Sequence, residues 1–184
     1  MKLRLKFSFP AVLAFTLCTD REGTALLCLF ACFLHETGHL IVMLAERKPP
    51  SEIILYGGGI HIKGGSKSLP SAAGGCVMNI LLFLLFYFVF PFREKFRLFG
   101  VINLILAAVN LLPLKELDGR LILEKAFIAF LPPARALKAV DITEKITVIF
   151  TLPAVVLLVF SGYMSFSAII FFFYLLAVDI FDKM

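Results

Sequence analysis

Long apolar stretches, separated by short polar or basic segments, dominate this chain. Six can be drawn, at about residues 7–19, 24–45, 70–91, 98–114, 146–162 and 163–180. A helix needs about 20 mostly apolar residues to cross a bilayer. The pattern therefore predicts an all-α polytopic membrane protein with about six transmembrane helices. The first segment is short, and only Ser161 and Gly162 separate the last two.

Two interruptions in this pattern predict further structure. Residues 51–65 place two β-prone runs on either side of three glycines, which predicts a small β-hairpin between the second and third apolar segments. Residues 120–140 mix apolar and basic positions. We expect them to be helical up to Leu131, broken at Pro132 and Pro133, and to lie on the cytoplasmic surface, with a plain connecting loop as the alternative.

The N-terminus resembles a signal peptide, because Lys2, Arg4 and Lys6 precede the apolar residues 7–19. No A-x-A cleavage site is evident, and more apolar segments follow. We expect this region to be retained as a short first membrane segment.

Composition and charge agree with a membrane location. The chain is 60% hydrophobic and 17% charged, whereas a soluble domain is nearer half apolar and a quarter charged. Its 184 residues leave room for a single membrane-embedded domain. The net charge of +5 comes from scattered basic residues rather than a stripe, which argues against a nucleic-acid partner. A six-span arrangement with both termini inside places 14 Lys and Arg on the cytoplasmic side and 4 outside.

Four cysteines, Cys18, Cys28, Cys32 and Cys76, lie in apolar segments, and none forms a C-x-x-C pair. We expect them to be small buried hydrophobic residues, with a thiolate metal ligand at Cys32, near the motif that follows, as the alternative.

An H-E-x-x-H motif, His35-Glu36-Thr37-Gly38-His39, lies inside the second apolar segment. Residues four apart share a helix face, so His35 and His39 can bind one metal ion, and Glu36 can take a proton from the attacking water. About 0.002 matches are expected by chance from the residue frequencies. Ionisable groups at membrane depth are costly, which also favours a functional role. The alternative is a buried polar cluster that joins helices by hydrogen bonds.

A catalytic zinc site usually has three protein ligands, so a third is needed. Asp118 is the preferred candidate, because it follows an apolar span and its predicted depth is on the same side as that of His39. The alternative role for Asp118 is a helix N-cap for the stretch that follows. His61, in the predicted hairpin, stays open as an alternative. Glu46 lies too far along the helix, and Glu52 is expected at the surface beyond two prolines.

The chain resembles the site-2 proteases, which are intramembrane zinc metalloproteases. His35-Glu36-Thr37-Gly38-His39 is similar to the family's H-E-x-G-H, and residues 110–119 are similar to its N-x-x-P followed by L-D-G. Residues 75–79 match a G-P-x-x-N element more weakly, with Cys76 in place of proline. The chain looks most like the short bacterial group typified by the sporulation protease that releases a membrane-tethered sigma factor.

The resemblance implies a catalytic core over about residues 24–119 that holds Zn²⁺ through His35, His39 and Asp118, with Glu36 as the acid/base. It implies that Asn79 and Asn110 contact an unwound substrate or shape the site, while interhelical hydrogen bonding is the alternative for both. The expected activity is hydrolysis of a peptide bond in or near a transmembrane segment of a membrane-tethered protein, such as a pro-sigma or anti-sigma factor. We expect a protein of the bacterial plasma membrane whose site faces the cytoplasm. Its expected partners are the membrane-protein substrate, the lipid bilayer and a membrane regulatory protein.

The sequence is also compatible with two other functions. One is a non-enzymatic membrane metal carrier or a scaffold, although no paired repeats with broken helices are visible. The other is a different membrane zinc peptidase that cleaves a soluble or prenylated chain and does not need the motif around Asp118.

Overall fold

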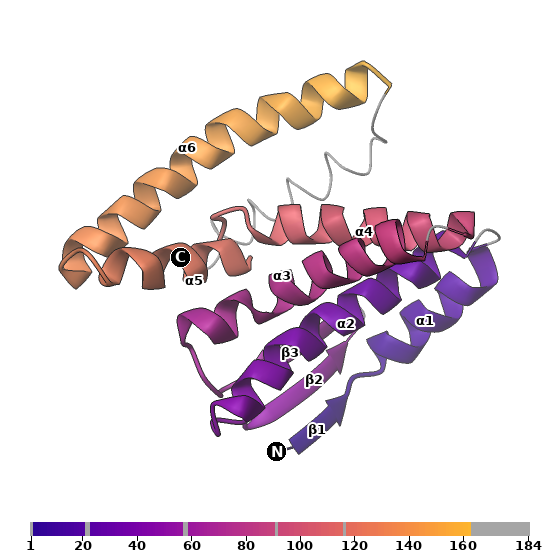
Figure 1. Cartoon of the computed structure of the whole chain (residues 1–184), viewed down its shortest axis with the longest axis horizontal. Coiled ribbons are helices and arrows are strands. Elements are labelled where there is room, and N and C mark those ends of the chain that lie inside the picture. The colour runs from indigo at the N-terminus through magenta and orange to yellow at the C-terminus, as the bar shows by residue number, and fades with distance from the viewer. Residues whose placement is uncertain (1, 21–22, 57–58, 91, 116, 163–184) are drawn as a thin grey trace. The chain divides into compact units, whose positions relative to one another are not determined.

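A computed structural model describes residues 2–20, 23–56, 59–90, 92–115 and 117–162 of the chain. The chain divides into two compact units, Met1–Val109 and Asn110–Met184, and each is described by itself (Figure 1).

The first unit holds a small sheet and most of the helices. Its elements are β1 (Lys2–Leu5), α1 (Ser8–Thr19), α2 (Thr24–Ala45), β2 (Glu52–Tyr56), β3 (Gly59–Lys63), α3 (Leu69–Leu84), a π-helical turn η1 (Leu85–Val89) and α4 (Glu94–Asn110), which reaches the unit boundary.

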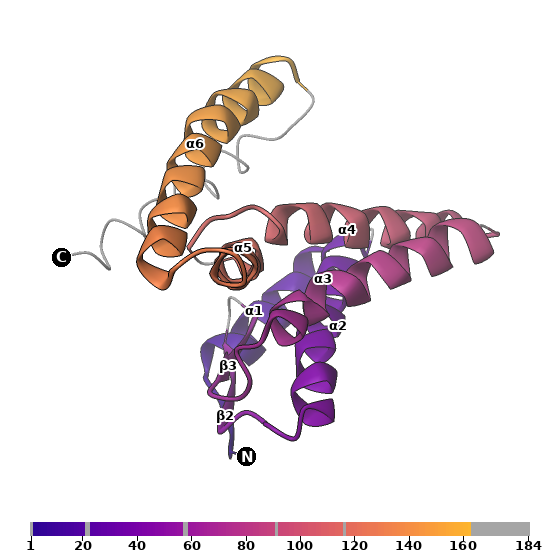
Figure 2. The ribbon, with the colours of Figure 1, turned by 60° about the vertical axis from the view of Figure 1, so that its left-hand side comes forward.

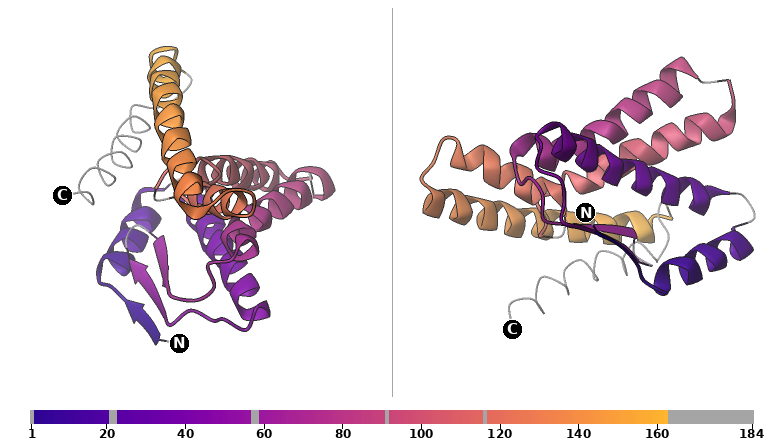
Figure 3. Two further views of the ribbon diagram at one scale, coloured as in Figure 1. Left: turned by 90° about the vertical axis from the view of Figure 1, so that its left-hand side faces the viewer. Right: turned by 90° about the horizontal axis from the view of Figure 1, so that it is seen from below.

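The predicted β-hairpin is confirmed and is part of a larger sheet. Strands β2 and β3 pair antiparallel, with Ile54 opposite His61, and β1 adds to the other edge of β2 in parallel (Figure 3). The sequence pattern does not predict β1, because basic residues before an apolar run are also typical of the flank of a membrane segment. The sequence Lys2-Leu3-Arg4-Leu5 alternates basic and apolar side chains, which is the period of a strand. Arg4 pairs with Glu52 of β2 and helps to hold β1 there.

Helices α2 and α3 form the core of the first unit, and glycines let their backbones approach closely. A Cβ on Gly38 would collide with the carbonyl oxygen of Gly74 and come within 2.7 Å of Met78 Cβ. A Cβ on Gly74 would lie 2.8 Å from the carbonyl oxygen of Gly38. Small residues at a crossing allow this contact in membrane helix pairs. Gly38 therefore stands at a crossing point as well as inside the H-E-x-x-H motif.

We expect Gly38→Ala to destabilise the protein by about 1–3 kcal/mol, because a methyl group at this crossing forces the two helices apart. Thermal unfolding in detergent measures the effect. Thr37→Ala is the matched control, because it changes the neighbouring residue, whose hydroxyl donates to the carbonyl oxygen of Phe33 within α2. Equal unfolding temperatures for wild type and Gly38→Ala would contradict the close crossing.

The ends of α2 are fixed by side chains. Asp20 accepts hydrogen bonds from the backbone N–H groups of Gly23, Thr24 and Leu26 and so satisfies the first turn. At the other end, the Ser68 hydroxyl donates to Glu46 at 2.6 Å, which ties α2 to the start of α3. Hydrogen bonding from Ser66 and Ser68 lowers the pKa of the Glu46 carboxyl. Glu46 thus has a structural role at the helix end.

Aromatic side chains join the π-helical turn η1 to α4. Phe86 packs edge-on against Phe96 and Phe99 of α4, with ring centroids 5.6 Å and 5.1 Å apart. Asn103 of α4 is fully buried and donates its amide N–H to the carbonyl oxygen of Phe99 at 2.8 Å. This asparagine lies on a helix other than the two that cross at Gly38.

The second unit contains α5 (Asp118–Ile128) and α6 (Pro133–Phe160), joined by a short turn (Figure 2). The predicted break at Pro132 and Pro133 is confirmed, although α5 ends slightly earlier than expected. Arg120 of α5 pairs with both Asp141 and Glu144 of α6, which fixes the two helices against each other. The apolar segment expected at 146–162 is the second half of α6, whose first half carries these charges.

Three described helical segments are long and apolar enough to cross a membrane: Thr24–Ala45, Leu69–Val89 and Pro133–Phe160. They support an integral membrane protein. Helices α1 and α4, with 12 and 17 residues, correspond to the expected segments 7–19 and 98–114. The last expected segment, 163–180, lies outside the described residues. The count of six spans stays a prediction.

The prediction of buried cysteines is right for Cys76 and wrong for Cys18, Cys28 and Cys32, which are exposed on α1 and α2. Apolar side chains on a membrane helix need no cover from protein, because lipid is as apolar as a protein core. The composition of a segment therefore does not tell which of its faces is buried.

Candidate metal centre

The two histidines of the motif lie on the buried face of α2. His35 and His39 are 5% and 7% exposed, and the buried face continues through Ala31, Gly38 and Met43. Other apolar residues of α2, such as Phe33 and Ile41, are about half exposed. On this membrane helix, the polar side chains thus face inwards and many of the apolar ones face outwards, which is the arrangement expected of a functional site.

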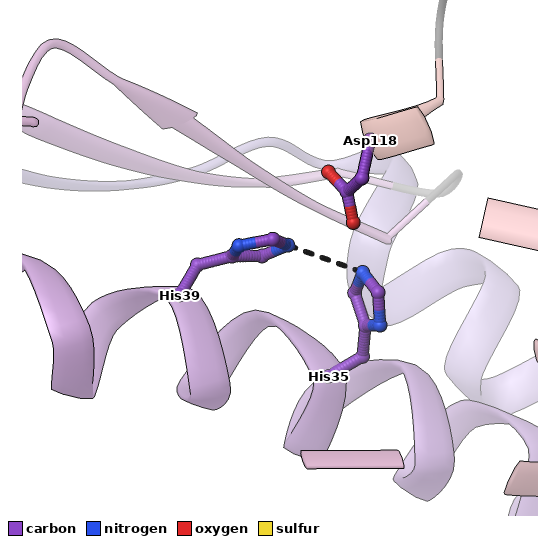
Figure 4. A group of neighbouring side chains, drawn as sticks. All are labelled: His35, His39 and Asp118. Carbon is purple, nitrogen blue, oxygen red and sulfur yellow. Dashed lines mark hydrogen bonds between the residues drawn. The ribbon is translucent and has the colours of Figure 1, made fainter. Parts of the chain in front are cut away.

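The two imidazoles are arranged to share a ligand. Their Nε2 atoms lie 3.2 Å apart, and the ring planes are inclined at 81° (Figure 4). Two nitrogens bound to one tetrahedral zinc ion at 2.0–2.1 Å would lie about 3.3 Å apart. The spacing of the two nitrogens therefore fits a shared metal ion.

Helix α3 holds the outer nitrogen of each imidazole. His39 Nδ1 lies 2.8 Å from the carbonyl oxygen of Ser71, and His35 Nδ1 lies 3.0 Å from the side-chain amide of Asn79. Both rings are thereby turned so that their Nε2 atoms point towards each other. Outer contacts of this kind orient metal-binding histidines in proteins.

Gly75 lies between these two contacts and leaves room for the nitrogens. A Cβ at this position would collide with His39 Nε2 and lie 2.6 Å from His35 Nε2. Ser71, Gly75 and Asn79 are four residues apart, so they form one stripe on α3, matched to the four-residue spacing of His35 and His39 on α2. This spacing is the sequence signal that would have identified Ser71 and Gly75 as parts of the site.

Glu36, the predicted acid/base, follows His35 on α2 and is partly exposed. A carboxylate next to a buried histidine pair has the chemistry needed to exchange protons with water.

Asp118 and Asn110 belong to the second unit. Asp118 is the first residue of α5 and is partly buried, and Asn110 is the last residue of α4. Gly119 is buried, and a Cβ on it would collide with the backbone carbonyl of Leu111. The glycine of the L-D-G motif therefore lets the start of α5 pack directly against the preceding chain, which fixes the position of Asp118 within its own unit.

His61, the alternative third ligand, lies in β3, where its backbone pairs with Ile54. Glu52 is in β2 and pairs with Arg4, so it is engaged in the sheet.

Comparison with solved structures shows a likeness in fold. The fold is similar to that of the Site-2 Protease from Methanocaldococcus jannaschii, with a TM-score of 0.60 and 18% sequence identity over 94% of this chain and 86% of that chain. No family model matches the sequence, and no curated protein matches it. The likeness shows that the two chains share a fold.

Proposed function

We propose that this protein is an intramembrane zinc metalloprotease of the site-2 protease type. The observation that carries the proposal is the pair of buried imidazoles on α2, with Nε2 atoms 3.2 Å apart and outer nitrogens held by α3. The fold likeness supports the same family. It gives no support to the sporulation subgroup, so cleavage of a membrane-tethered pro-sigma or anti-sigma factor rests on the motif resemblance alone.

His35, His39 and Asp118 are the proposed zinc ligands, drawn in Figure 4. Two imidazoles and one carboxylate are a common donor set for catalytic zinc, and they leave a fourth position open. A bound zinc ion would supply Lewis acidity, which lowers the pKa of water and polarises a carbonyl group. Asp118 is preferred to His61 because its residue type completes this set and because Gly119 holds it in place.

Glu36 is the proposed acid/base. It takes a proton from the attacking water and later gives it to the leaving nitrogen of the cleaved peptide bond. The substrate would be a membrane segment that unwinds locally, because an intact helix engages its peptide carbonyls in its own hydrogen bonds. Asn110 and Asn79 would contact that unwound segment, which is the role that the family resemblance implies for both.

Zinc content of the detergent-purified protein tests the proposal. We expect about one zinc ion per chain in the wild type, and in Asp118→Ala a loss of affinity greater than about 100-fold, since even an outer contact to a ligand is worth 10–100-fold. Glu124→Ala is the matched control, because it removes another carboxylate from the same helix and should leave zinc content unchanged.

Each other outcome has its own meaning. A wild-type protein without zinc, after purification without chelators, would overturn the metalloprotease proposal. Full zinc in Asp118→Ala together with its loss in His61→Ala would make His61 the third ligand. Metal-dependent transport that survives Glu36→Gln would favour the carrier function.

A further inference from the structure

Asn79 occupies an unusual position on α3. Its side chain is fully buried, its amide nitrogen lies 3.0 Å from His35 Nδ1, and its amide oxygen has no hydrogen-bond partner. A buried amide normally uses both its donor and its acceptor, so an unused acceptor beside an imidazole nitrogen calls for an explanation.

The shortest contacts around the two imidazoles favour one arrangement of protons. His39 Nδ1 lies 2.8 Å from the carbonyl oxygen of Ser71 and 3.3 Å from the backbone nitrogen of Gly75. The carbonyl oxygen is the closer of the two and can only accept, so we assign the proton to this nitrogen, which donates it to Ser71. His39 Nε2 is then an acceptor, and His35 Nε2, 3.2 Å away, is the donor to it. His35 Nδ1 is left as an acceptor, and the Asn79 amide nitrogen donates to it.

Binding of one metal ion by both Nε2 atoms requires a different arrangement at His35. Each Nε2 must offer its lone pair, so each neutral ring carries its proton on Nδ1. His39 already has that tautomer and keeps its bond to Ser71. His35 must change tautomer, and its Nδ1–H then needs an acceptor where the Asn79 amide nitrogen now lies.

We propose that Asn79 is the positioning residue of His35 and serves both arrangements by turning its side-chain amide. Rotation about the last side-chain bond exchanges Oδ1 and Nδ2, so the unused oxygen becomes the acceptor for His35 Nδ1–H. This role rests on the proposed zinc site and is distinct from the substrate contact predicted for Asn79. An asparagine fits it because one side chain offers both a donor and an acceptor.

Two substitutions separate the acceptor from the rest of the side chain. Asn79→Asp keeps an acceptor at nearly the same place, and Asn79→Leu keeps the approximate size without any polar group. Zinc affinity, measured by competition with a chromophoric chelator in detergent, should be 10–100-fold weaker in Asn79→Leu and within a few-fold of wild type in Asn79→Asp.

Asn103→Leu is the matched control. Asn103 is also fully buried in the first unit with an unpartnered amide oxygen, but its amide bonds to the backbone of its own helix, at Phe99. Its replacement should lower thermal stability without changing zinc affinity. An equal loss of zinc affinity in Asn103→Leu and Asn79→Leu would mean that both act through general destabilisation, which would overturn the positioning role.

The other outcomes are equally decisive. Wild-type affinity in Asn79→Leu would overturn the inference while leaving the zinc proposal intact. A zinc affinity of Asn79→Asp more than about tenfold below that of the wild type would also overturn the inference, because a hydrogen-bond acceptor at this position would then be insufficient. This test holds even if Asn79→Leu fails to fold. Absence of zinc from the wild type would overturn the proposed function itself and, with it, this role.

Discussion

Glu36→Gln is expected to reduce peptide cleavage about 10²–10⁴-fold while zinc remains bound, because glutamine keeps the size of the side chain but cannot accept a proton. The proposed zinc ligands are untouched by this change, and glutamine is close to glutamate in volume. The measurement pairs zinc content with cleavage of single-span reporter segments in reconstituted vesicles. The reporters should include helix-weakening residues, since a stable helix resists cleavage.

Glu46→Gln is the matched control for that experiment. Glu46 is also a glutamate at α2, but it caps the helix and accepts a hydrogen bond from Ser68. Its replacement should affect stability and leave cleavage near the wild-type rate. Undiminished cleavage in Glu36→Gln would exclude the proposed acid/base and with it the mechanism.

Gly75→Ala is expected to abolish zinc binding, with a loss of affinity greater than about 100-fold. The added methyl group would occupy the space directly beside His35 Nε2 and His39 Nε2, the two nitrogens that must face the metal. Relief would require α3 to move away from α2, which the crossing of Gly38 and Gly74 opposes. Zinc affinity by chelator competition measures the effect, alongside thermal unfolding of the same samples.

Gly100→Ala serves as the comparison, because it adds the same methyl group to a helix of the same unit. A Cβ there would lie 3.2 Å from the backbone nitrogen of Tyr87, a tight contact far milder than that at Gly75, and no imidazole is among its nearest atoms. We expect some loss of stability and full zinc affinity. If Gly75→Ala bound zinc as tightly as Gly100→Ala, the space beside the imidazoles would not belong to a metal site.

The helical core of the site could be predicted from the sequence because its signals are local. The spacing of His35 and His39 determines that they share a helix face, and glycines between β-prone runs determine the hairpin. The place of Asp118 after an apolar span indicates it as a candidate ligand, and its role as a ligand stays a prediction. The single domain with a catalytic core over residues 24–119 and the cytoplasmic orientation of the site also stay predictions.

Other features depend on partners distant in sequence. β1 forms only because β2 offers an edge some 50 residues later, so Lys2-Leu3-Arg4-Leu5 in isolation is also compatible with the flank of a membrane segment. Gly75 and Ser71 become parts of the site only when α3 crosses α2. For Asn79 the family resemblance implies contact with the substrate or a role in shaping the site, because a sequence motif does not reveal which side chain a buried asparagine contacts.

The stripe formed by Ser71, Gly75 and Asn79 has a consequence for how the protein meets bilayers of different thickness. Sliding α3 by one turn along α2 would bring Ser71 or Asn79, both larger than glycine, to the place where Gly75 leaves room for the imidazoles. The two helices therefore have one permitted register. Hydrophobic mismatch with a thinner or thicker membrane must be absorbed by tilting α2 and α3 together or by deforming the lipid, since sliding would dismantle the histidine pair.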